Sequence, residues 1–154
     1  MGDCVMCRGV DGDADLLREQ VWEDELWRLT TAVDGEVVGF SYLEPKRHVR
    51  YIEELDGPEA ATFGTVLARS CAAIKQACDA ERVYVYVFGG SVPHLHLHLA
   101  PHHPGGALNE ALIKGNVVEQ TMPSGVVLFT SDEFPPLPAA EMRAGVDKLR
   151  AALS

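Results

Sequence analysis

The alternation of apolar and polar residues along the chain predicts a set of short strands. Residues 82–88 (Arg-Val-Tyr-Val-Tyr-Val-Phe) alternate strongly, and a following strand over residues 92–100 is expected to end before Pro101. An Asp34-Gly35 turn separates two further apolar stretches, which is typical of a hairpin. The remaining strands that the pattern predicts are residues 25–33, residues 37–44 (stopped by Pro45) and residues 126–130.

Apolar residues take a helical spacing in two other places. Asp56 is expected to cap a helix that runs to about Asp79, and residues 139–153 predict a final helix. Residues 1–20 are polar and are expected to be irregular. These elements predict an α+β fold in which one long helix packs on a mostly antiparallel sheet. The chain has 154 residues, so a single domain over residues 1–154 is expected.

Composition and charge narrow the classes of partner. Apolar residues make up 47% of the chain, which is enough for a core, and no apolar run is long enough to cross a bilayer. The first residues lack the pattern of a secretory signal, so a cytoplasmic protein is expected. The formal net charge of −10 disfavours nucleic-acid polymers and anionic membranes as partners. A small phosphorylated ligand remains compatible with this charge, because a few local donors can outweigh a distant field.

Half of the chain's six histidines lie in the sequence His94-Leu95-His96-Leu97-His98. Because side chains alternate across a strand, the imidazoles are expected on one face and the leucines on the core face. Three interpretations fit this pattern: a solvated strand face, a three-histidine zinc centre that activates water, and nucleophilic catalysis on a phosphoryl group. The spacing alone does not separate the second interpretation from the third.

The four cysteines fall into two pairs. Cys71 and Cys78 lie two helical turns apart and are expected to fill the core. Cys4 and Cys7 form a Cys-x-x-Cys motif in the polar N-terminal segment. This motif has three interpretations: chance, a redox pair, or half of a zinc site. A redox pair usually sits at a helix start in a βαβ unit, which is not the pattern of this segment.

The surroundings of the histidines resemble the histidine-triad (HIT) family. Residues 89–99 (Gly-Gly-Ser-Val-Pro-His-Leu-His-Leu-His-Leu) resemble the family motif His-φ-His-φ-His-φ-φ, in which φ is apolar. Residues 39–48 (Gly-Phe-Ser-Tyr-Leu-Glu-Pro-Lys-Arg-His) resemble its glycine–strand–Pro-Lys-x-His segment, and the Cys-x-x-Cys motif resembles its zinc-bearing bacterial branch. The resemblance covers about residues 4–104, leaves residues 105–154 as a C-terminal extension, and implies a HIT-like α+β fold.

The resemblance implies a nucleotide hydrolase or nucleotidyl transferase. Such an enzyme cleaves at the α-phosphate of a nucleoside monophosphate ester, anhydride or phosphoramidate through a covalent nucleotidyl-histidine. Carried over position by position, His96 is the nucleophile and His98 contacts the phosphate. Ser91 bonds the leaving group, and the backbone near Gly89 and Gly90 holds phosphate oxygens.

Several positions depart from the family pattern. Gly90 stands where the family usually has glutamine, and Phe40 replaces a frequent histidine. The position of the ribose-binding acidic or amide residue is Ala32 here, and Asp34 fits this nucleotide-binding role if the loop is two residues shorter. These departures leave the base, the leaving group, and the choice between hydrolysis and transfer to phosphate or a sugar phosphate undetermined.

The zinc-bearing relatives imply a structural zinc ion held by Cys4, Cys7, His48 and His94, with no open position for water. The family also implies a homodimer with a small nucleotide as its substrate. Two other functions stay open. One is a zinc-dependent hydrolase that uses His94, His96 and His98 as ligands, and the other is a non-enzymatic nucleotide-binding module.

Overall fold

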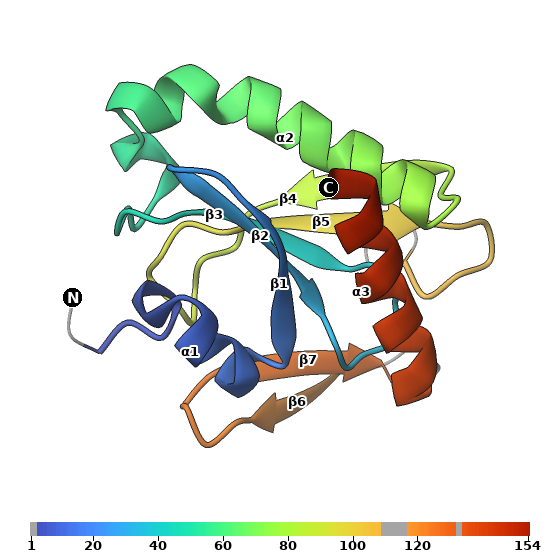
Figure 1. Ribbon diagram of the computed structural model, residues 1–154. Coiled ribbons are helices and arrows are strands. Elements are labelled where there is room, and N and C mark those ends of the chain that lie inside the picture. Colours follow the sequence, from blue (N-terminus) through green and yellow to red (C-terminus); the bar gives the residue numbers. More distant parts are fainter. Residues whose placement is uncertain (1–2, 109–116, 132–133) are drawn as a thin grey trace.

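The fold is built on a five-stranded antiparallel sheet with the strand order β1-β2-β3-β5-β4. The computed structural model describes residues 3–108, 117–131 and 134–154 (Figure 1). The α+β architecture that the sequence predicts is confirmed. The strands of the sheet are β1 (Arg18–Glu23), β2 (Trp27–Ala32), β3 (Ser41–Pro45), β4 (Arg82–Tyr86) and β5 (Leu97–His102).

β3 and β5 start several residues later than the alternation predicts. β3 begins at Ser41, because the chain before it turns through Gly39 at a φ of +83°. A Cβ atom on Gly39 would lie 2.2 Å from the Cys78 sulfur, so this turn requires glycine. β5 begins at Leu97, and the predicted start at residue 92 is wrong, because the Leu95 amide donates to the Val49 carbonyl at 2.7 Å, outside the sheet ladder.

The strand ends also differ from the prediction. β5 continues through Pro101 to His102, because a proline at this position leaves the antiparallel pairing with β4 intact. β4 ends at Tyr86, two residues earlier than the apolar pattern suggests. Asp56 precedes the long helix but makes no capping hydrogen bond, since its carboxylate accepts a bond from Arg47 at 2.7 Å.

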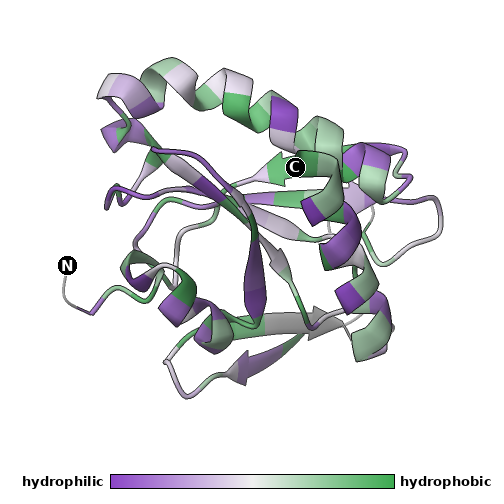
Figure 2. Ribbon diagram, viewed as in Figure 1, coloured by the Kyte–Doolittle hydropathy of each residue, from purple (hydrophilic) through white to green (hydrophobic). Residues whose placement is uncertain are grey.

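The N-terminal segment is more regular than the sequence predicts. It contains the short helices η1 (Met6–Arg8), α1 (Val10–Asp13) and η2 (Ala14–Leu16), and then β1 pairs with β2. Polar residues at the start of β1 hide this strand from a hydropathy pattern (Figure 2). The interpretation of residues 1–20 as irregular is therefore wrong where β1 begins.

Two helices cover one face of the sheet (Figure 1). The long helix α2 (Gly57–Ala77) contacts β2 to β5, and α3 (Ala139–Leu153) packs on α2 and β1. The ring of Trp27 packs against Phe63, and its indole nitrogen donates to Thr62 at 2.9 Å. No helix in the described ranges is long and apolar enough to span a membrane. The side chains buried in this core include Trp27, Leu29, Leu43, Ile74, Leu95, Leu97, Leu99, Val146 and Leu149.

A two-stranded hairpin lies apart from the main sheet. It consists of β6 (Val117–Thr121) and β7 (Val127–Ser131), of which only β7 is predicted by the sequence pattern. A short helical segment, η3 (Ile52–Glu54), precedes α2. The hairpin and the N-terminal segment share a second apolar cluster, which contains Val5, Met6, Val92 and Val126, with Cys4, Leu16, Met122 and Leu128 packed against it.

Candidate functional site

His98 lies on the face of the sheet opposite the helices. Tyr42 on β3, His98 on β5 and Tyr86 on β4 are paired in register, so their side chains form one row across the sheet. Their neighbours along β5, Leu97 and Leu99, point into the core and are at most 2% exposed. The alternation of leucine and histidine therefore places His98 on the open face, as the sequence predicts.

His94 and His96 precede β5 and have separate environments. The Nδ1–H group of His96 donates to the His94 carbonyl oxygen at 2.6 Å, which leaves Nε2 of His96 with a free lone pair. Burial lowers the pKa of His96 below its usual value, so the ring is neutral near pH 7. A neutral imidazole with an unprotonated Nε2 is a competent nucleophile.

His98 lies beside His96 at the mouth of an apolar pocket. The two rings stack with their centroids 5.2 Å apart. The Nε2 atom of His98 is buried and has no hydrogen-bond partner among the residues that the structure describes. Burial, and to a smaller degree His96, lower the pKa of His98 to about 3. A buried, unpartnered ring nitrogen is costly, so this atom marks a place where a ligand can bind.

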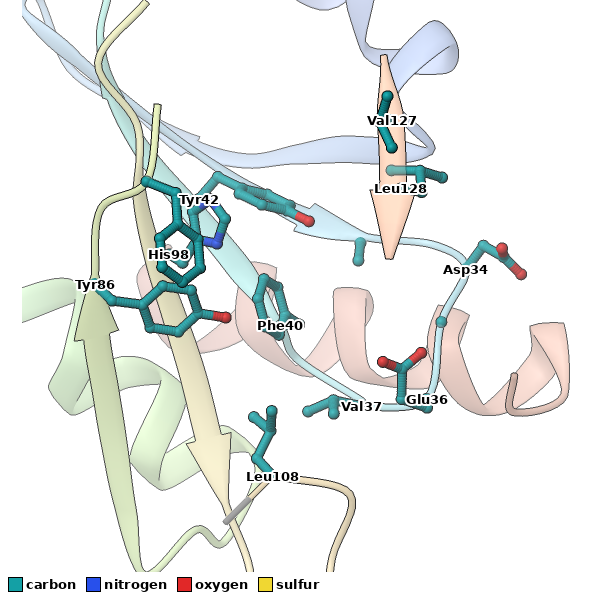
Figure 3. Close-up of a pocket in the computed structure, with 13 residues that line it drawn as sticks. Asp34, Glu36, Val37, Phe40, Tyr42, Tyr86, His98, Leu108, Val127 and Leu128 are labelled. Atoms are coloured by element: carbon teal, nitrogen blue, oxygen red, sulfur yellow. The ribbon is translucent and has the colours of Figure 1, made fainter. Parts of the chain in front are cut away.

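The pocket beside His98 is mainly apolar and aromatic (Figure 3). Phe40 contacts the His98 ring edge-on with centroids 5.9 Å apart, and Tyr86 lies 4.7 Å from it. Burial raises the pKa of Tyr42 to about 12, so its hydroxyl stays protonated. The residues that line the pocket are Ala32, Asp34, Gly35, Glu36, Val37, Phe40, Tyr42, Tyr86, Phe88, His98, Leu108, Val127 and Leu128.

Two carboxylates belong to this lining, and only one was singled out by the sequence. Asp34 and Ala32 both line the pocket, but the Asp34 carboxylate points away from the aromatic residues (Figure 3). The Glu36 carboxylate points into the pocket, and burial together with Asp34 raises its pKa. Glu36 was missed because an acidic residue in a predicted turn looks like a solvated one, and only the folded loop reveals its direction.

A possible metal site lies on the other side of His94. The ligand atoms of Cys4, Cys7, His48 and His94 all lie within 4.8 Å of one another. The Cys7 sulfur is 3.2 Å from Nδ1 of His48 and 3.5 Å from Nδ1 of His94. In a tetrahedral zinc site, bonds of about 2.0 Å to nitrogen and about 2.3 Å to sulfur place such atoms roughly 3.5 Å apart. The donor set and these separations fit zinc.

The surroundings of the cluster prepare His94 to bind a metal. Its Nε2–H group donates to the Pro45 carbonyl oxygen at 2.8 Å, which leaves an unprotonated Nδ1 facing the sulfurs. Burial, with the neighbouring Cys4 thiol, raises the pKa of Cys7 to about 11, so a cation is needed to stabilise a pair of thiolates here. The cluster therefore connects the N-terminal segment to His48, which follows β3, and to His94, which lies two positions before His96.

A buried network of four charges lies next to the histidines, and the sequence analysis did not find it. Glu44 accepts a bidentate pair of bonds from Arg18, at 2.8 Å and 2.9 Å, and a bond from Arg28 at 3.2 Å. Both arginines also bond Asp13. The four side chains are at most 6% exposed and their formal charges cancel. The Arg-Glu-Gln-Val sequence of residues 18–21 gives no sign of this burial, because the four partners come from four different segments.

Residues 89–91, which the sequence predicts to hold the phosphate, do not border the pocket. Ser91 is exposed, and its hydroxyl makes no hydrogen bond with any residue in the described part of the chain. Gly89 has a φ of +72°, a conformation that favours glycine, and a Cβ on Gly90 would meet open space. Neither glycine nor Ser91 lines the apolar pocket, so they lie outside the cavity that His98 borders.

Solved structures with the same fold come from several bacteria and an archaeon. A zinc-bound histidine triad family protein from Mycobacterium smegmatis has a TM-score of 0.63 at 22% identity, covering 97% of this chain and 92% of its own. A histidine triad protein from Sinorhizobium meliloti has a TM-score of 0.66 at 17% identity, covering 90% and 92%. A hypothetical histidine triad nucleotide-binding protein from Sulfolobus tokodaii has a TM-score of 0.65 at 19% identity, covering 97% and 91%.

Sequence comparison assigns the family directly. A search among curated proteins gave no match to this chain. The sequence model of the HIT domain matches residues 17–105, which include the histidine segment, the glycine turn and the whole five-stranded sheet. This match covers more than half of the chain, and the similar structures share its fold along nearly its full length. The chain therefore belongs to the HIT domain family.

Proposed function

We propose that this chain is a nucleotide hydrolase or nucleotidyl transferase that acts through a covalent nucleotidyl-histidine on His96. The observation that carries this proposal is the hydrogen bond from Nδ1 of His96 to the His94 carbonyl, at 2.6 Å. It fixes the tautomer in which Nε2 carries the lone pair, beside a second neutral ring at the mouth of a pocket.

The reaction follows from these positions. Nε2 of His96 attacks the α-phosphorus, and the bond from phosphorus to the leaving oxygen or nitrogen breaks. His98 contacts the phosphate, and the Ser91 hydroxyl donates to the leaving atom, which takes its proton from solvent. Water or another acceptor then attacks the phosphorus, loses its proton to solvent, and displaces Nε2 of His96 as the bond from phosphorus to nitrogen breaks. The bond to the His94 carbonyl holds the ring in one orientation through both steps.

The zinc ion in this proposal is structural. Cys4, Cys7, His48 and His94 would hold it, and a bound zinc would stabilise the fold around the residue two positions before the nucleophile. In the described part of the chain, the histidine and cysteine cluster that could hold a metal contains His94 but neither His96 nor His98. This arrangement favours the structural role over a catalytic zinc held by the three histidines.

The pocket supports a nucleoside as the bound part of the substrate. Aromatic and aliphatic side chains suit a flat base, and the Asp34 and Glu36 carboxylates are acceptors for hydroxyl or N–H donors. We further propose that the chain forms a homodimer through β4, the edge strand of the sheet, on which Val85 is exposed, with the exposed Phe88 just after the strand. Analytical ultracentrifugation of Val85→Asp beside the wild-type chain tests the dimer.

The covalent step is tested by mass spectrometry of the intact protein after mixing with a nucleoside 5′-phosphoramidate. We expect a nucleoside-monophosphate adduct on the wild-type chain and on His103→Ala, in which an exposed loop histidine is replaced. His96→Gly should show no adduct and should lose several orders of magnitude in turnover, while it keeps its zinc.

Three results would contradict the proposal in different ways. Zinc loss in His96→Gly would favour the catalytic-zinc hypothesis. Nucleotide binding without turnover or adduct would favour a non-enzymatic binding module. Near-normal turnover by His96→Gly would exclude His96 as the nucleophile.

A further inference from the structure

The pocket beside His98 is completed by residues outside the segment that defines the family. The HIT domain match ends at residue 105, yet Leu108, Val127 and Leu128 line the same pocket as His98. Val127 and Leu128 come from the β6–β7 hairpin, which pairs with no strand of the main sheet among the described residues. Figure 3 shows both side chains across the pocket from Phe40 and Tyr86.

We propose that the β6–β7 hairpin, with Leu108, forms the wall that contacts the base of a nucleoside monophosphate and so determines which base is accepted. This inference rests on the proposed function, because it takes the phosphate to lie at His96 and His98. A base is a flat and largely apolar group, and the pocket offers aromatic rings on the sheet side and aliphatic groups on the hairpin side.

The hairpin is held in place by contacts that do not involve the pocket. Val126 is 9% exposed and packs with Val5, Met6 and Val92, so the hairpin rests on the N-terminal segment. The turn between its strands is closed by bonds from the Met122 amide to the Val126 carbonyl at 2.8 Å and from the Gly125 amide to the Met122 carbonyl at 2.9 Å. These contacts give the pocket wall a fixed support.

Leu128 belongs to both regions. It lines the pocket, and it also packs against the apolar cluster that contains Cys4 and Val5. Leu108 is fixed separately, since Nδ1 of His102 at the end of β5 donates to its carbonyl oxygen at 2.7 Å. The wall is therefore connected to the sheet at one end and to the N-terminal segment at the other, which suits a surface that discriminates between ligands.

The position of the hairpin should separate the contribution of the base to the binding free energy from the contribution of the phosphate. Leu128 should act on the base alone, because His98, to which the phosphate contact is assigned, lies across the pocket from it, and Ser91 does not line the pocket. A ligand that has the sugar and the phosphate but no base, ribose 5-phosphate, should therefore be indifferent to the hairpin. This difference distinguishes a specificity-determining wall from a general structural support.

Calorimetric titration of the zinc-loaded chain tests the inference. The probes are AMP, GMP, CMP, UMP and ribose 5-phosphate. For the nucleotide that binds most tightly, Leu128→Ala should raise the Kd about tenfold, because it removes about three carbon atoms of apolar contact. Leu128→Trp should weaken that nucleotide at least as much by filling the pocket. Both variants should bind ribose 5-phosphate as the wild-type chain does.

The matched control is Val118→Ala, which shortens an aliphatic side chain on the same hairpin that is 49% exposed and does not line the pocket. It should leave all five Kd values unchanged. Equal weakening of the nucleotide and of ribose 5-phosphate, or an unchanged Kd for the nucleotide in both Leu128 variants, would overturn the inference while leaving the proposed function standing. A wild-type chain that binds none of the nucleotides would contradict the proposed function, and this inference with it.

Discussion

The two ends of the histidine segment differ in how their polar atoms are satisfied. At the His94 end, one ring nitrogen donates to the Pro45 carbonyl and the other faces the Cys4 and Cys7 sulfurs. At the His98 end, Nε2 is buried beside an apolar pocket without a partner among the described residues. Buried polar groups are normally bonded, so the satisfied end is a framework and the unsatisfied end is where we propose that the substrate binds. His96 lies between the two and takes its orientation from the first.

The buried charge network also supports the His94 end of the histidine segment. Glu44 lies directly before Pro45 on β3, and the arginines that bond it come from β1 and β2. A neutral, fully paired network of this kind fixes geometry, because any displacement leaves a charge unpaired in a region of low dielectric. The cluster of cysteines and histidines and this network thus restrain the same short stretch of backbone from two sides.

The largest effect is expected from breaking the metal cluster. Cys4→Ser should lose most of its zinc and unfold at a temperature on the order of 10 °C lower, since about 3 kcal/mol or more of stability corresponds to such a shift in a chain of this size. Elemental analysis and calorimetry measure both quantities. Cys71→Ser removes a half-buried thiol from α2, outside the cluster, and should keep its zinc. Zinc retention by Cys4→Ser would contradict the assignment of this ligand.

An effect of similar size on stability, without loss of zinc, is expected from breaking the buried charge network. Glu44→Gln leaves Arg18 and Arg28 with one unpaired positive charge, and removing one partner of a buried pair costs about 3–5 kcal/mol. Glu23→Gln is the control, because Glu23 pairs with Lys46 at the surface, where such pairs contribute about 0–1 kcal/mol. Urea denaturation of both variants measures the difference. Equal losses would mean that burial does not distinguish the two pairs.

Replacing Ser91 tests the part of the proposed site that is exposed to solvent. Ser91→Ala should slow turnover by about one to two orders of magnitude if the hydroxyl assists the leaving group. Thermal stability should not change, because the side chain is exposed and bonds nothing else in the described residues. Ser124→Ala, at an exposed turn of the hairpin, is the control for loss of a hydroxyl. The same rate in Ser91→Ala with every leaving group would reduce Ser91 to a turn residue.

The sequence predicted the parts of this site that depend on local spacing. The order of leucine and histidine placed Leu97 and Leu99 in the core and His98 on the open face, and the predicted Asp34-Gly35 turn lies in the connection between the antiparallel strands β2 and β3. The four possible zinc ligands were grouped through the family resemblance, since 45 residues of chain separate His48 from His94 and no local pattern joins them.

Other features could not be read from the sequence because they depend on tertiary contacts. β1 begins with polar residues, and Arg18 is buried only because Asp13 and Glu44 meet it. Glu36 faces the pocket because of how its loop turns. The pocket wall at Leu128 comes from a hairpin whose first strand has no clear pattern. In each case, the decisive partner lies on a different segment of the chain.

The smallest expected effect is a change in how stability depends on pH, and it distinguishes His98 from the His94 end of the histidine segment. The pKa of His98 is about 3 in the folded chain, against an ordinary value near 6.5 in the unfolded chain. Below pH 6.5 the unfolded chain therefore binds a proton that the folded chain does not. The contribution of the neutral ring to stability is complete above pH 6.5 and is lost as the pH falls toward 3, by up to about 1.4 kcal/mol per pH unit.

His98→Gln removes this titrating group, so the free energy of unfolding should depend less steeply on pH in this variant than in the wild-type chain between pH 6.5 and 5. Protonation of the zinc ligands also destabilises the fold in acid, but it acts equally in both proteins and cancels in the difference. Ser124→Ala changes no titratable group and should keep the wild-type slope. Because burial also lowers the pKa of His96, the acid limb of kcat/KM for a singly charged nucleotide phosphodiester should lie below pH 6.5. An acid limb at or above pH 6.5, together with equal slopes in wild type and His98→Gln, would mean that the histidine face is solvated and that its open end is not the binding surface.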